Sequence, residues 1–455
     1  MNLNNFNEKI KENKYYKKIK NDSFWNNLFK NSFWAFSGDA GAALLGLVIT
    51  IVLIKLIGNN AYGILVLAQT YMGILDIILN VQSWKSVIQY GQRSLVEKQY
   101  NELNSYIKIG TILDVSTAIL GGIIAILIAP TLGKIFNWSN ELIICSQIFS
   151  ITIFSHFSGT PTAILRILNK FNLVAIQKFI TAAVKLIVLL IIYFVKNNVG
   201  LYEATIIYSV TDIVGNLILV IFAFIEYHRR FSDFKILKAK LPKNSKEFIT
   251  FTLWGTVADI VDVPVNYFDV FIVSLLGNEK VSIFKVFKQC IAILQKVTSP
   301  IQQSILPQFS ELSAKKEEIR GYEIVLKIRN VILKTIGPIA IVLGVSSPLW
   351  LKLLYGDEYA NNWCILFIYL LVQTFALSYT TIHPYFLSLN KAKFSTIYVC
   401  IANVIYMVLA ILLIKPFGLI GIVLAYFVQV LVVIYLKIIN IKRENIEEKR
   451  KKLYE

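Results

Sequence analysis

Side chains of opposite charge follow one another along two adjacent apolar stretches between Trp254 and Gln303. On a helical wheel, the polar residues of the first stretch fall within an arc of about 80°; they are Asp259, Asp262, Asn266 and Asp269. Those of the second stretch fall within an arc of roughly 100°; they are Lys285, Lys288, Gln289 and Lys296. A charge at the centre of a bilayer costs on the order of 2.5–3.5 kcal/mol. The two stripes therefore predict a hydrated lumen, with ion pairs that join the two helices as the alternative.

The basic stripe predicts an anionic ligand. The idealised cost of moving an ion into hydrocarbon is of order 20 kcal/mol, and ammonium groups that line a cavity replace the lost water. We therefore predict that Lys285, Lys288 and Lys296 contact a phosphate group, together with Gln289. The aspartates have two alternative roles: they hold the lysines when the lumen is empty, or they bind a coupling ion, H⁺ or Na⁺.

Polar residues of the first half of the chain are candidates for the opposite wall of the lumen. Gln69, Asp76 and Asn80 fall within an arc of roughly 40° of one predicted helix. Asp39 lies in the first apolar stretch. Gln69 is predicted to contact the ligand, and Asp76 and Asp39 to act as coupling or counter-charge groups. For Asp39, helix packing beside neighbouring glycines is the alternative.

Composition and periodicity predict an all-α polytopic membrane protein. The chain has 455 residues, 56% of them hydrophobic, and a mean hydropathy of +0.61, which leaves too little polar surface for a soluble domain. Pro264 predicts a kink or break within its helix, and the lone charges Lys185 and Asp212 are candidates for a structural ion pair. Twelve transmembrane helices are expected, at residues 33–54, 61–82, 108–129, 142–164, 173–195, 203–225, 249–276, 281–303, 329–349, 363–387, 394–414 and 418–436.

The placement of basic residues predicts orientation. The formal net charge is +18, and 35 of the 46 Lys and Arg residues lie in one alternating set of segments, against six in the other. Such a bias is typical of cytoplasmic loops and argues against nucleic acid as a ligand. Both termini are therefore expected in the cytoplasm. The four cysteines lie in apolar stretches without metal-ligand spacing, so neither a metal nor an organic cofactor is predicted.

Short motifs recur in the two halves of the chain. Trp34-x4-Asp39 returns as Trp254-x4-Asp259, 220 positions later, and Leu56-x-Gly58-Asn59 returns as Leu275-x-Gly277-Asn278, 219 positions later. Parallel repeats of this kind are a transporter architecture with the ligand site between the halves. The expected organisation is a basic cytoplasmic segment (1–32), an N-lobe of six helices (33–226), a basic linker (227–248), a C-lobe of six helices (249–436) and a basic tail (437–455).

Short motifs after four of the predicted helices resemble those of a known family. They are Leu56-Ile-Gly-Asn-Asn-Ala-Tyr62-Gly63, Leu165-Arg166 with Lys170, Pro307-x-Phe-Ser310 and Tyr355-Gly356-Asp357-Glu358-Tyr359. The family is that of the Wzx-like oligosaccharide flippases, the polysaccharide-transport branch of the multidrug/oligosaccharidyl-lipid/polysaccharide (MOP) exporter superfamily.

This resemblance implies a MATE-like fold with a central cavity that opens alternately to each side of the cytoplasmic (inner) membrane. It implies a cargo of undecaprenyl-pyrophosphate-linked glycan repeat units, moved from the inner to the outer leaflet for surface polysaccharide synthesis, with coupling to a cation gradient. The expected partners are the cargo and membrane lipids, and a glycan polymerase and a chain-length regulator are candidates.

Several alternatives remain open beside the flippase. A drug/cation antiporter of the same superfamily predicts an acidic and aromatic lining with few cations. A lipid II flippase is expected to carry two further helices. A membrane glycan polymerase, from another class, requires a large outer loop with catalytic arginines, which the predicted short outer loops do not provide. The sequence contains no motif of an enzyme site, so a transporter rather than an enzyme is expected.

Overall fold

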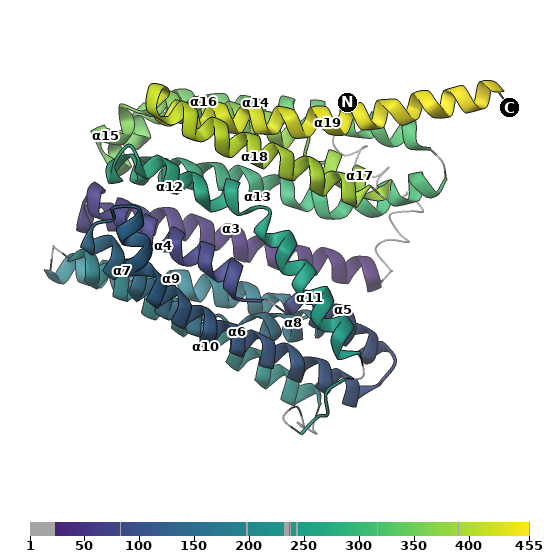
Figure 1. Ribbon diagram of the computed structural model, residues 1–455, viewed down its shortest axis with the longest axis horizontal. Coiled ribbons are helices and arrows are strands. Elements are labelled where there is room, and N and C mark those ends of the chain that lie inside the picture. The colour runs from purple at the N-terminus through teal and green to yellow at the C-terminus, as the bar shows by residue number, and fades with distance from the viewer. Residues whose placement is uncertain are drawn as a thin grey trace, which may run out of the picture.

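The computed structural model describes residues 23–81, 83–196, 199–231, 236, 238–242, 244–315, 317–389 and 391–454, and these residues form helices joined by short turns. The helices run along the long axis of the molecule (Figure 1). The turns at one end of the bundle include those after Ile57, Ser274 and Tyr355, and we call this end the short-loop end. The opposite end, where α3 begins and α19 terminates, is called the basic end.

The N-lobe is formed by the first half of the chain, drawn in purple to teal in Figure 1. Its helices are α3 (Ser23–Ile57), α4 (Asn59–Leu79), α5 (Trp84–Val96), α6 (Tyr100–Ile135), α7 (Asn140–Ser150), the 3₁₀ turn η1 (Ile151–Ser155), α8 (Gly159–Ile167), α9 (Phe171–Lys196) and α10 (Leu201–Arg230). Helix α5 is a short helix within the segment predicted as a loop.

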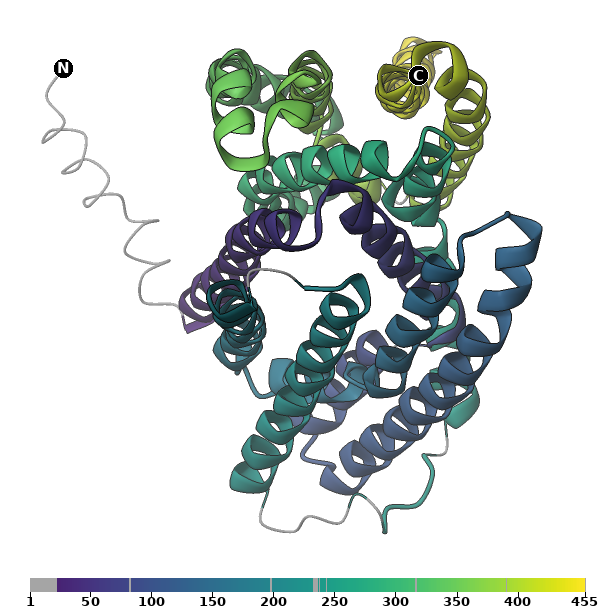
Figure 2. The same ribbon diagram turned by 90° about the vertical axis from the view of Figure 1, so that its left-hand side faces the viewer.

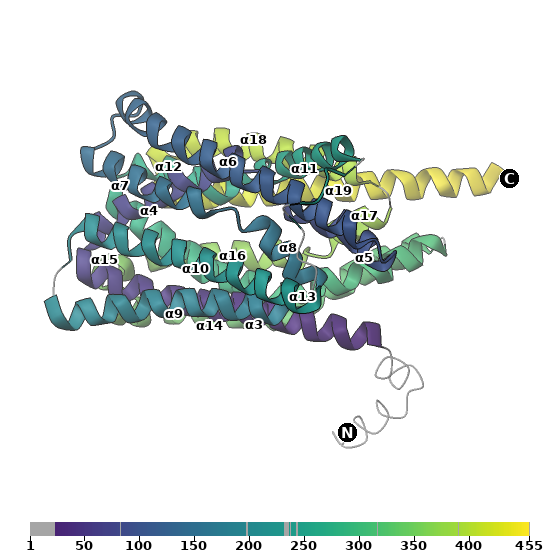
Figure 3. The same ribbon diagram turned by 90° about the horizontal axis from the view of Figure 1, so that it is seen from below.

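The C-lobe lies beside the N-lobe and is drawn in teal to yellow. Its elements are α11 (Ser245–Ile260), η2 (Pro264–Phe268), α12 (Asp269–Ser274), α13 (Asn278–Ala314), α14 (Glu318–Tyr355), α15 (Asp357–Ala360), α16 (Trp363–Ser378), α17 (Ile382–Ser388), α18 (Ala392–Phe417) and α19 (Leu419–Tyr454). The end-on view shows the lobes as two separate groups of helices that meet at α3, α4 and α13 (Figure 2). Helix α19 continues past its neighbours at the basic end (Figure 3).

The predicted membrane-spanning architecture is confirmed. Among the described residues, nine helices are long and apolar enough to cross a bilayer, and eleven spans result if each of two pairs bent by 41° counts as one. Helix α13 has 37 residues but is interrupted by charge, and with it the helices fit the twelve predicted spans. Large apolar side chains such as Leu349 and Leu353, each 78% exposed, cover the outside, as expected for a surface in contact with lipid.

The predicted break at Pro264 is confirmed, and it divides one span between the two lobes. Proline has no N–H to donate, so the helical ladder is interrupted there, and residues Pro264–Phe268 form a single wide π turn. Before the break, Phe248 of α11 is fully buried in a core cluster made by N-lobe helices. After the break, Val270 and Val273 of α12 are buried with α13 in the main core. Figure 1 shows α11 crossing from one lobe to the other.

The lobes are in close contact at the short-loop end. Gly58 and Gly277, which the repeat equates, both have positive φ (79° and 100°) and precede α4 and α13. Only glycine adopts this conformation without a steric penalty. Gly63 of α4 packs so tightly against Asn278 that an added Cβ would lie 2.0 Å from its carbonyl oxygen. Tyr359 also donates a hydrogen bond of 2.7 Å to the Asn59 side chain.

Several predicted boundaries differ from the structure. The spans predicted at 142–164 and 249–276 are each broken, and the one predicted at 363–387 consists of two helices, α16 and α17. The helix predicted at 108–129 is longer, because α6 covers Tyr100–Ile135. Most of the basic segment 1–32, and residues 232–235, 237 and 243 of the linker 227–248, lie outside the described residues.

Candidate functional site

Two adjoining cavities lie where the lobes meet, and they carry opposite charge. The first has a volume of about 490 Å³ and is enclosed by α3, α4, α9, α10 and α13. The second has a volume of about 700 Å³ and lies between α4, α11, η2 and α13. We call the first the basic cavity; its charged lining residues are Lys178, Lys185, Lys285 and Asp212. We call the second the acidic cavity; its charged lining residues are Asp76, Asp259, Asp262 and Lys285. His156 borders both.

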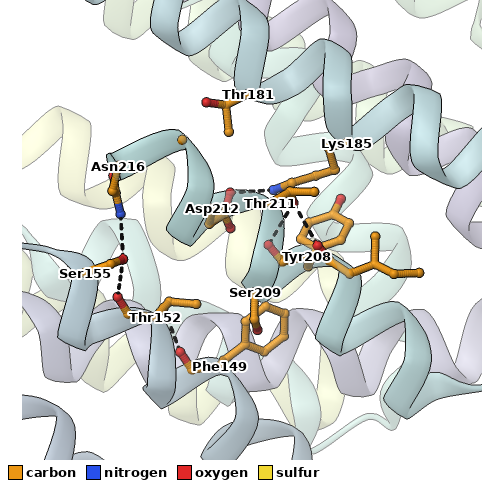
Figure 4. Close-up of polar contacts among 12 residues, drawn as sticks. Phe149, Thr152, Ser155, Thr181, Lys185, Tyr208, Ser209, Thr211, Asp212 and Asn216 are labelled. Carbon is orange, nitrogen blue, oxygen red and sulfur yellow. Dashed lines mark hydrogen bonds and ion pairs between the residues drawn. The ribbon is translucent and has the colours of Figure 1, made fainter. Parts of the chain in front are cut away.

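A network of polar contacts holds the wall of the basic cavity in place (Figure 4). The Lys185 ammonium of α9 donates to the Asp212 carboxylate of α10 at 2.7 Å and lies 4.0 Å from the centre of the Tyr208 ring. The predicted pairing of Lys185 with Asp212 is therefore confirmed. Asn216, one turn further along α10, donates to the Ser155 hydroxyl in the broken span of the N-lobe. These contacts fix α9, α10 and η1 relative to one another.

The acidic cavity contains carboxylates from both lobes. Asp76 of α4 lies 2.9 Å from the His156 ring and accepts a hydrogen bond from Asn80 at 3.0 Å. Asp259 of α11 accepts from the Lys85 ammonium at 2.7 Å. Asp262 also lines this cavity, and the described residues offer it no ion-pair or hydrogen-bond partner. Asp259 and Asp262 of the predicted acidic stripe thus line one cavity with α4 and with Lys285 of α13, although neither forms an ion pair with a lysine of α13 among the described residues.

Lys285 is the one charged residue that the two cavities share. It lies on α13 next to Phe284 and Val286, which are fully buried in the main core. Within the described part of the chain, its ammonium has neither an ion pair nor a hydrogen bond. An ammonium at a cavity wall without a counter-charge attracts an anion strongly, because the surrounding medium is less polar than water.

Lys288, one turn after Lys285, is held by the protein itself. Its ammonium donates to both oxygens of Asp269 at 2.9 and 2.7 Å, and to the carbonyl oxygens of Val265 and Asn266 at 3.1 Å. The Asp269 side chain is only 2% exposed. Both carbonyls belong to the π turn Pro264–Phe268, so this one segment supplies both main-chain acceptors of Lys288. Of the two facing stripes predicted on this hairpin, Lys288 and Asp269 form the direct ion pair.

The remaining predicted residues lie at the edges of the two cavities or beside them. Asp39 of α3 forms ion pairs with Lys178 at 2.5 Å and with Lys296 at 3.6 Å, and so connects the lobes. Gln69 and Gln289 both line the basic cavity. Gln289 also donates to Thr50 at 3.0 Å.

Sequence reasoning missed two cationic contributors to these sites. Lys178 lies within the helix predicted at 173–195 but is not among the predicted site residues; it lies near the start of α9 and lines the basic cavity. Lys85 is the partner of Asp259, and it lies on α5, in a segment predicted as a loop. No local pattern links Lys85 to Asp259.

The arrangement of two lobes around these cavities defines a class of transporter. A structure titled as an inward-facing multidrug resistance MATE family transporter of the MOP superfamily aligns over 88% of this chain and 95% of its own, with a TM-score of 0.69 and 14% identity. The lipid II flippase MurJ, in an inward closed conformation, aligns over 90% of this chain and 87% of its own, with a TM-score of 0.66 and 17% identity. The chain has the fold of MOP-superfamily transporters.

The family follows from sequence. A family model described as polysaccharide biosynthesis protein matches residues 28–313, and the chain belongs to this family. A candidate O-antigen transporter of Shigella flexneri is 27% identical over 274 residues, which are 59% of this chain and 62% of the relative. Inner membrane protein YghQ of Escherichia coli (strain K12) is 28% identical over 145 residues, which are 31% of this chain and 40% of the relative. Each match covers less than two thirds of the relative's length. The prediction of a multi-pass membrane protein is confirmed.

Proposed function

We propose that the protein is a flippase that moves undecaprenyl-pyrophosphate-linked oligosaccharide repeat units from the inner to the outer leaflet of the cytoplasmic membrane by alternating access. The basic end then faces the cytoplasm, in agreement with the distribution of Lys and Arg. The name of the Shigella flexneri relative and the family description support a glycan cargo. A glycan polymerase and a chain-length regulator are the partners that such a cargo would require next.

The observation that carries this proposal is the unpaired ammonium of Lys285. A diphosphate that enters the basic cavity would meet this ammonium, which has no ion-pair partner among the described residues, whereas Lys178 of α9 is already paired with Asp39. The glycan would extend into the adjoining acidic cavity, whose carboxylates and amides are hydrogen-bond acceptors and donors for sugar hydroxyls. Lys288 has a different role in this proposal, because Asp269 already neutralises it.

The acidic cavity supplies the second half of the proposed mechanism. Asp262 and Asp76 are carboxylates in a confined space that includes His156, and carboxylates within membrane proteins are common carriers of H⁺ or Na⁺. A cation bound there adds positive charge beside Lys285, at the boundary of the two cavities. We propose that a cation bound in the acidic cavity favours binding of the anionic cargo. Release of the cation on the other side of the membrane would then favour release of the cargo.

The experiment is translocation in proteoliposomes that contain the purified full-length protein and the lipid-linked oligosaccharide, with an added lectin that detects the outer glycan. Loss of one charge-assisted contact removes about 1.5–3 kcal/mol, so Lys285→Met is expected to slow translocation by about tenfold or more. Lys285→Arg is expected to retain most of it. The matched control is Lys334→Met, an exposed lysine of α14 in the same lobe. Translocation by Lys285→Met at the wild-type rate would disprove the role of Lys285.

The acidic cavity also favours a second candidate, the drug/cation antiporter. Asp76, Asp259 and Asp262 provide the acidic lining that such a protein requires. The same proteoliposomes test it when they are loaded with a fluorescent cationic dye. Transport of the dye driven by a proton or sodium gradient, together with no movement of the lipid-linked oligosaccharide, would replace the flippase proposal with the antiporter.

A further inference from the structure

A third cavity lies inside the C-lobe, away from the two described above. Its volume is about 460 Å³, and it is enclosed by α13, α16, α17, α18 and α19. A cavity of this size can accommodate a phosphate or a diphosphate. Its polar lining residues include Lys296, Lys437, His383, Gln373, Gln429 and Thr298, and its described lining has no carboxylate. It shares no lining residue with the basic or the acidic cavity.

The Lys437 ammonium is buried at the wall of this cavity without a counter-charge. Lys437 lies on α19, four residues before the apolar span ends at Ile441, and it is only 2% exposed. A lysine so close to the end of a span normally extends its ammonium to the membrane surface. Here the side chain is directed inward instead. Within the described residues no carboxylate pairs with it.

The groups that do contact Lys437 cannot neutralise it. Its ammonium lies 3.4 Å from His383 Nδ1 and 5.9 Å from the centre of the Phe386 ring. Nδ1 of His383 is also 3.0 Å from the Ser395 hydroxyl, so two groups share that nitrogen. Taking an ammonium out of water costs several kcal/mol even after relaxation. Neither an imidazole nor a ring face offsets this cost as an anion would.

Nearby cations increase the positive potential. The Lys391 ammonium lies 5.4 Å from the centre of the same Phe386 ring and donates to the Asn440 side chain at 2.8 Å. Lys296 lines the cavity from α13, and its ion pair with Asp39 of the N-lobe is long, at 3.6 Å. Basic pockets between membrane helices on the cytoplasmic side are typical sites for lipid phosphate groups.

We propose that the C-lobe cavity is a second anion site, which binds one phosphate-containing group with Lys437 as its principal contact and His383 and Lys296 beside it. The phosphate belongs either to a lipid headgroup or to a free phosphate anion. This site is separate from the cargo site at Lys285 and does not depend on which cargo the protein carries. Because Lys296 reaches Asp39 across the lobe boundary, an anion here also competes for one contact that joins the lobes.

The test uses the purified full-length protein and two probes. Inorganic pyrophosphate tests the free anion through the shift in unfolding temperature and through calorimetry. Nanodiscs with phosphatidylglycerol, compared with nanodiscs of phosphatidylcholine alone, test the headgroup through native mass spectrometry of retained lipid. The variants are Lys437→Met, Lys437→Arg and Lys285→Met, with Lys334→Met as the exposed control in the same lobe.

The expected result is a loss of affinity for the bound probe of at least tenfold in Lys437→Met, with wild-type behaviour in Lys437→Arg and Lys334→Met. Lys285→Met is expected to bind an anion at the C-lobe site as the wild type does. A failure of the second-site proposal can therefore be distinguished from a failure of the flippase proposal. Without any anion, Lys437→Met is expected to unfold at the same or a higher temperature than the wild type, because it removes an unpaired buried charge. The proposal is overturned if neither probe binds the wild type, or if Lys437→Met binds both probes as the wild type does.

Discussion

The basic and acidic cavities share Lys285 and His156 but differ in what their remaining charges do. In the basic cavity, Lys185 is neutralised by Asp212 at 2.7 Å. In the acidic cavity, Asp262 has no ion-pair partner among the described residues. Lys285 and Asp262, which form no ion pair within the described part of the chain, thus line the same acidic cavity.

This difference shows that the charge pattern of a membrane helix does not by itself identify which groups its charged residues contact. Lys285 and Lys288 are three residues apart and belong to one stripe. Lys288 is surrounded by four oxygen atoms of the C-lobe, whereas Lys285 has no such neighbours. The ordered pair stabilises the broken span, and the unpaired residue is available for a ligand. The following predictions test this division, from the largest expected effect to the smallest.

Removal of the Lys288 side chain is expected to destabilise the C-lobe most. In Lys288→Met, the Asp269 carboxylate, 2% exposed, loses its partner, and breaking a buried ion pair costs about 3–5 kcal/mol. Lys285→Met, on the same helix, is expected to leave stability nearly unchanged. Equilibrium unfolding in detergent measures both. Equal stability of the two variants would show that the two lysines do not differ in the way described.

Asp212→Asn is expected to have a smaller but clear effect on the N-lobe. It leaves the Lys185 ammonium, whose side chain is 11% exposed, next to a neutral amide. Because Asp212 is itself 31% exposed, water offsets part of the loss, and we expect about 2 kcal/mol of destabilisation. The double variant Lys185→Met/Asp212→Asn should recover part of that stability. A double variant less stable than Asp212→Asn would contradict the ion-pair explanation.

Asp76→Asn and Asp262→Asn are expected to separate the two cavities functionally. Each should reduce gradient-driven translocation by about tenfold, which corresponds to about 1.4 kcal/mol, and should leave pyrophosphate affinity at the wild-type value or above it. Lys178→Met should instead lower the affinity for pyrophosphate, since Lys178 lines the basic cavity but not the acidic one. Translocation assays with and without a cation gradient measure the first effect, and calorimetry with pyrophosphate in a Lys437→Met background, which removes the C-lobe site, measures the second. If Asp262→Asn weakens anion binding as much as Lys285→Met, the cavities form a single site.

Asp259→Asn is expected to have the smallest effect on stability. Its partner Lys85 is 36% exposed and Asp259 is 50% exposed, and pairs this open to water contribute about 0–1 kcal/mol. The change in unfolding free energy should therefore stay below about 1 kcal/mol. Lys85→Met serves as the matched variant from the other side of the contact. A loss of more than about 2 kcal/mol in either variant would mean that this pair is far less hydrated than its exposure indicates.

The sequence predicts the helices of this protein well because apolar length and loop charge are local properties. The break at Pro264 and the paired turns at Gly58 and Gly277 were accessible in the same way, from residues whose backbone limits are known. The partners of charged residues were not. Asp259 and Lys85 are 174 positions apart, and their contact depends on α11 packing on the N-lobe, which no periodicity reveals. The difference between Lys285 and Lys288 likewise depends on the Asp269 carboxylate and on two main-chain carbonyls, which the charge pattern does not reveal.

The division of one span between two bodies limits how the molecule can move. Phe248 is buried among N-lobe helices, and α12, which carries Val270, contacts α13, α18 and α19 of the C-lobe as well as α4. A rotation of one lobe against the other therefore requires a change in the backbone conformation of Pro264–Phe268, or a loss of the packing of α11 on the N-lobe. The same peptide units supply the carbonyl oxygens that accept hydrogen bonds from Lys288. A change in their backbone conformation would therefore also change the contacts of Lys288.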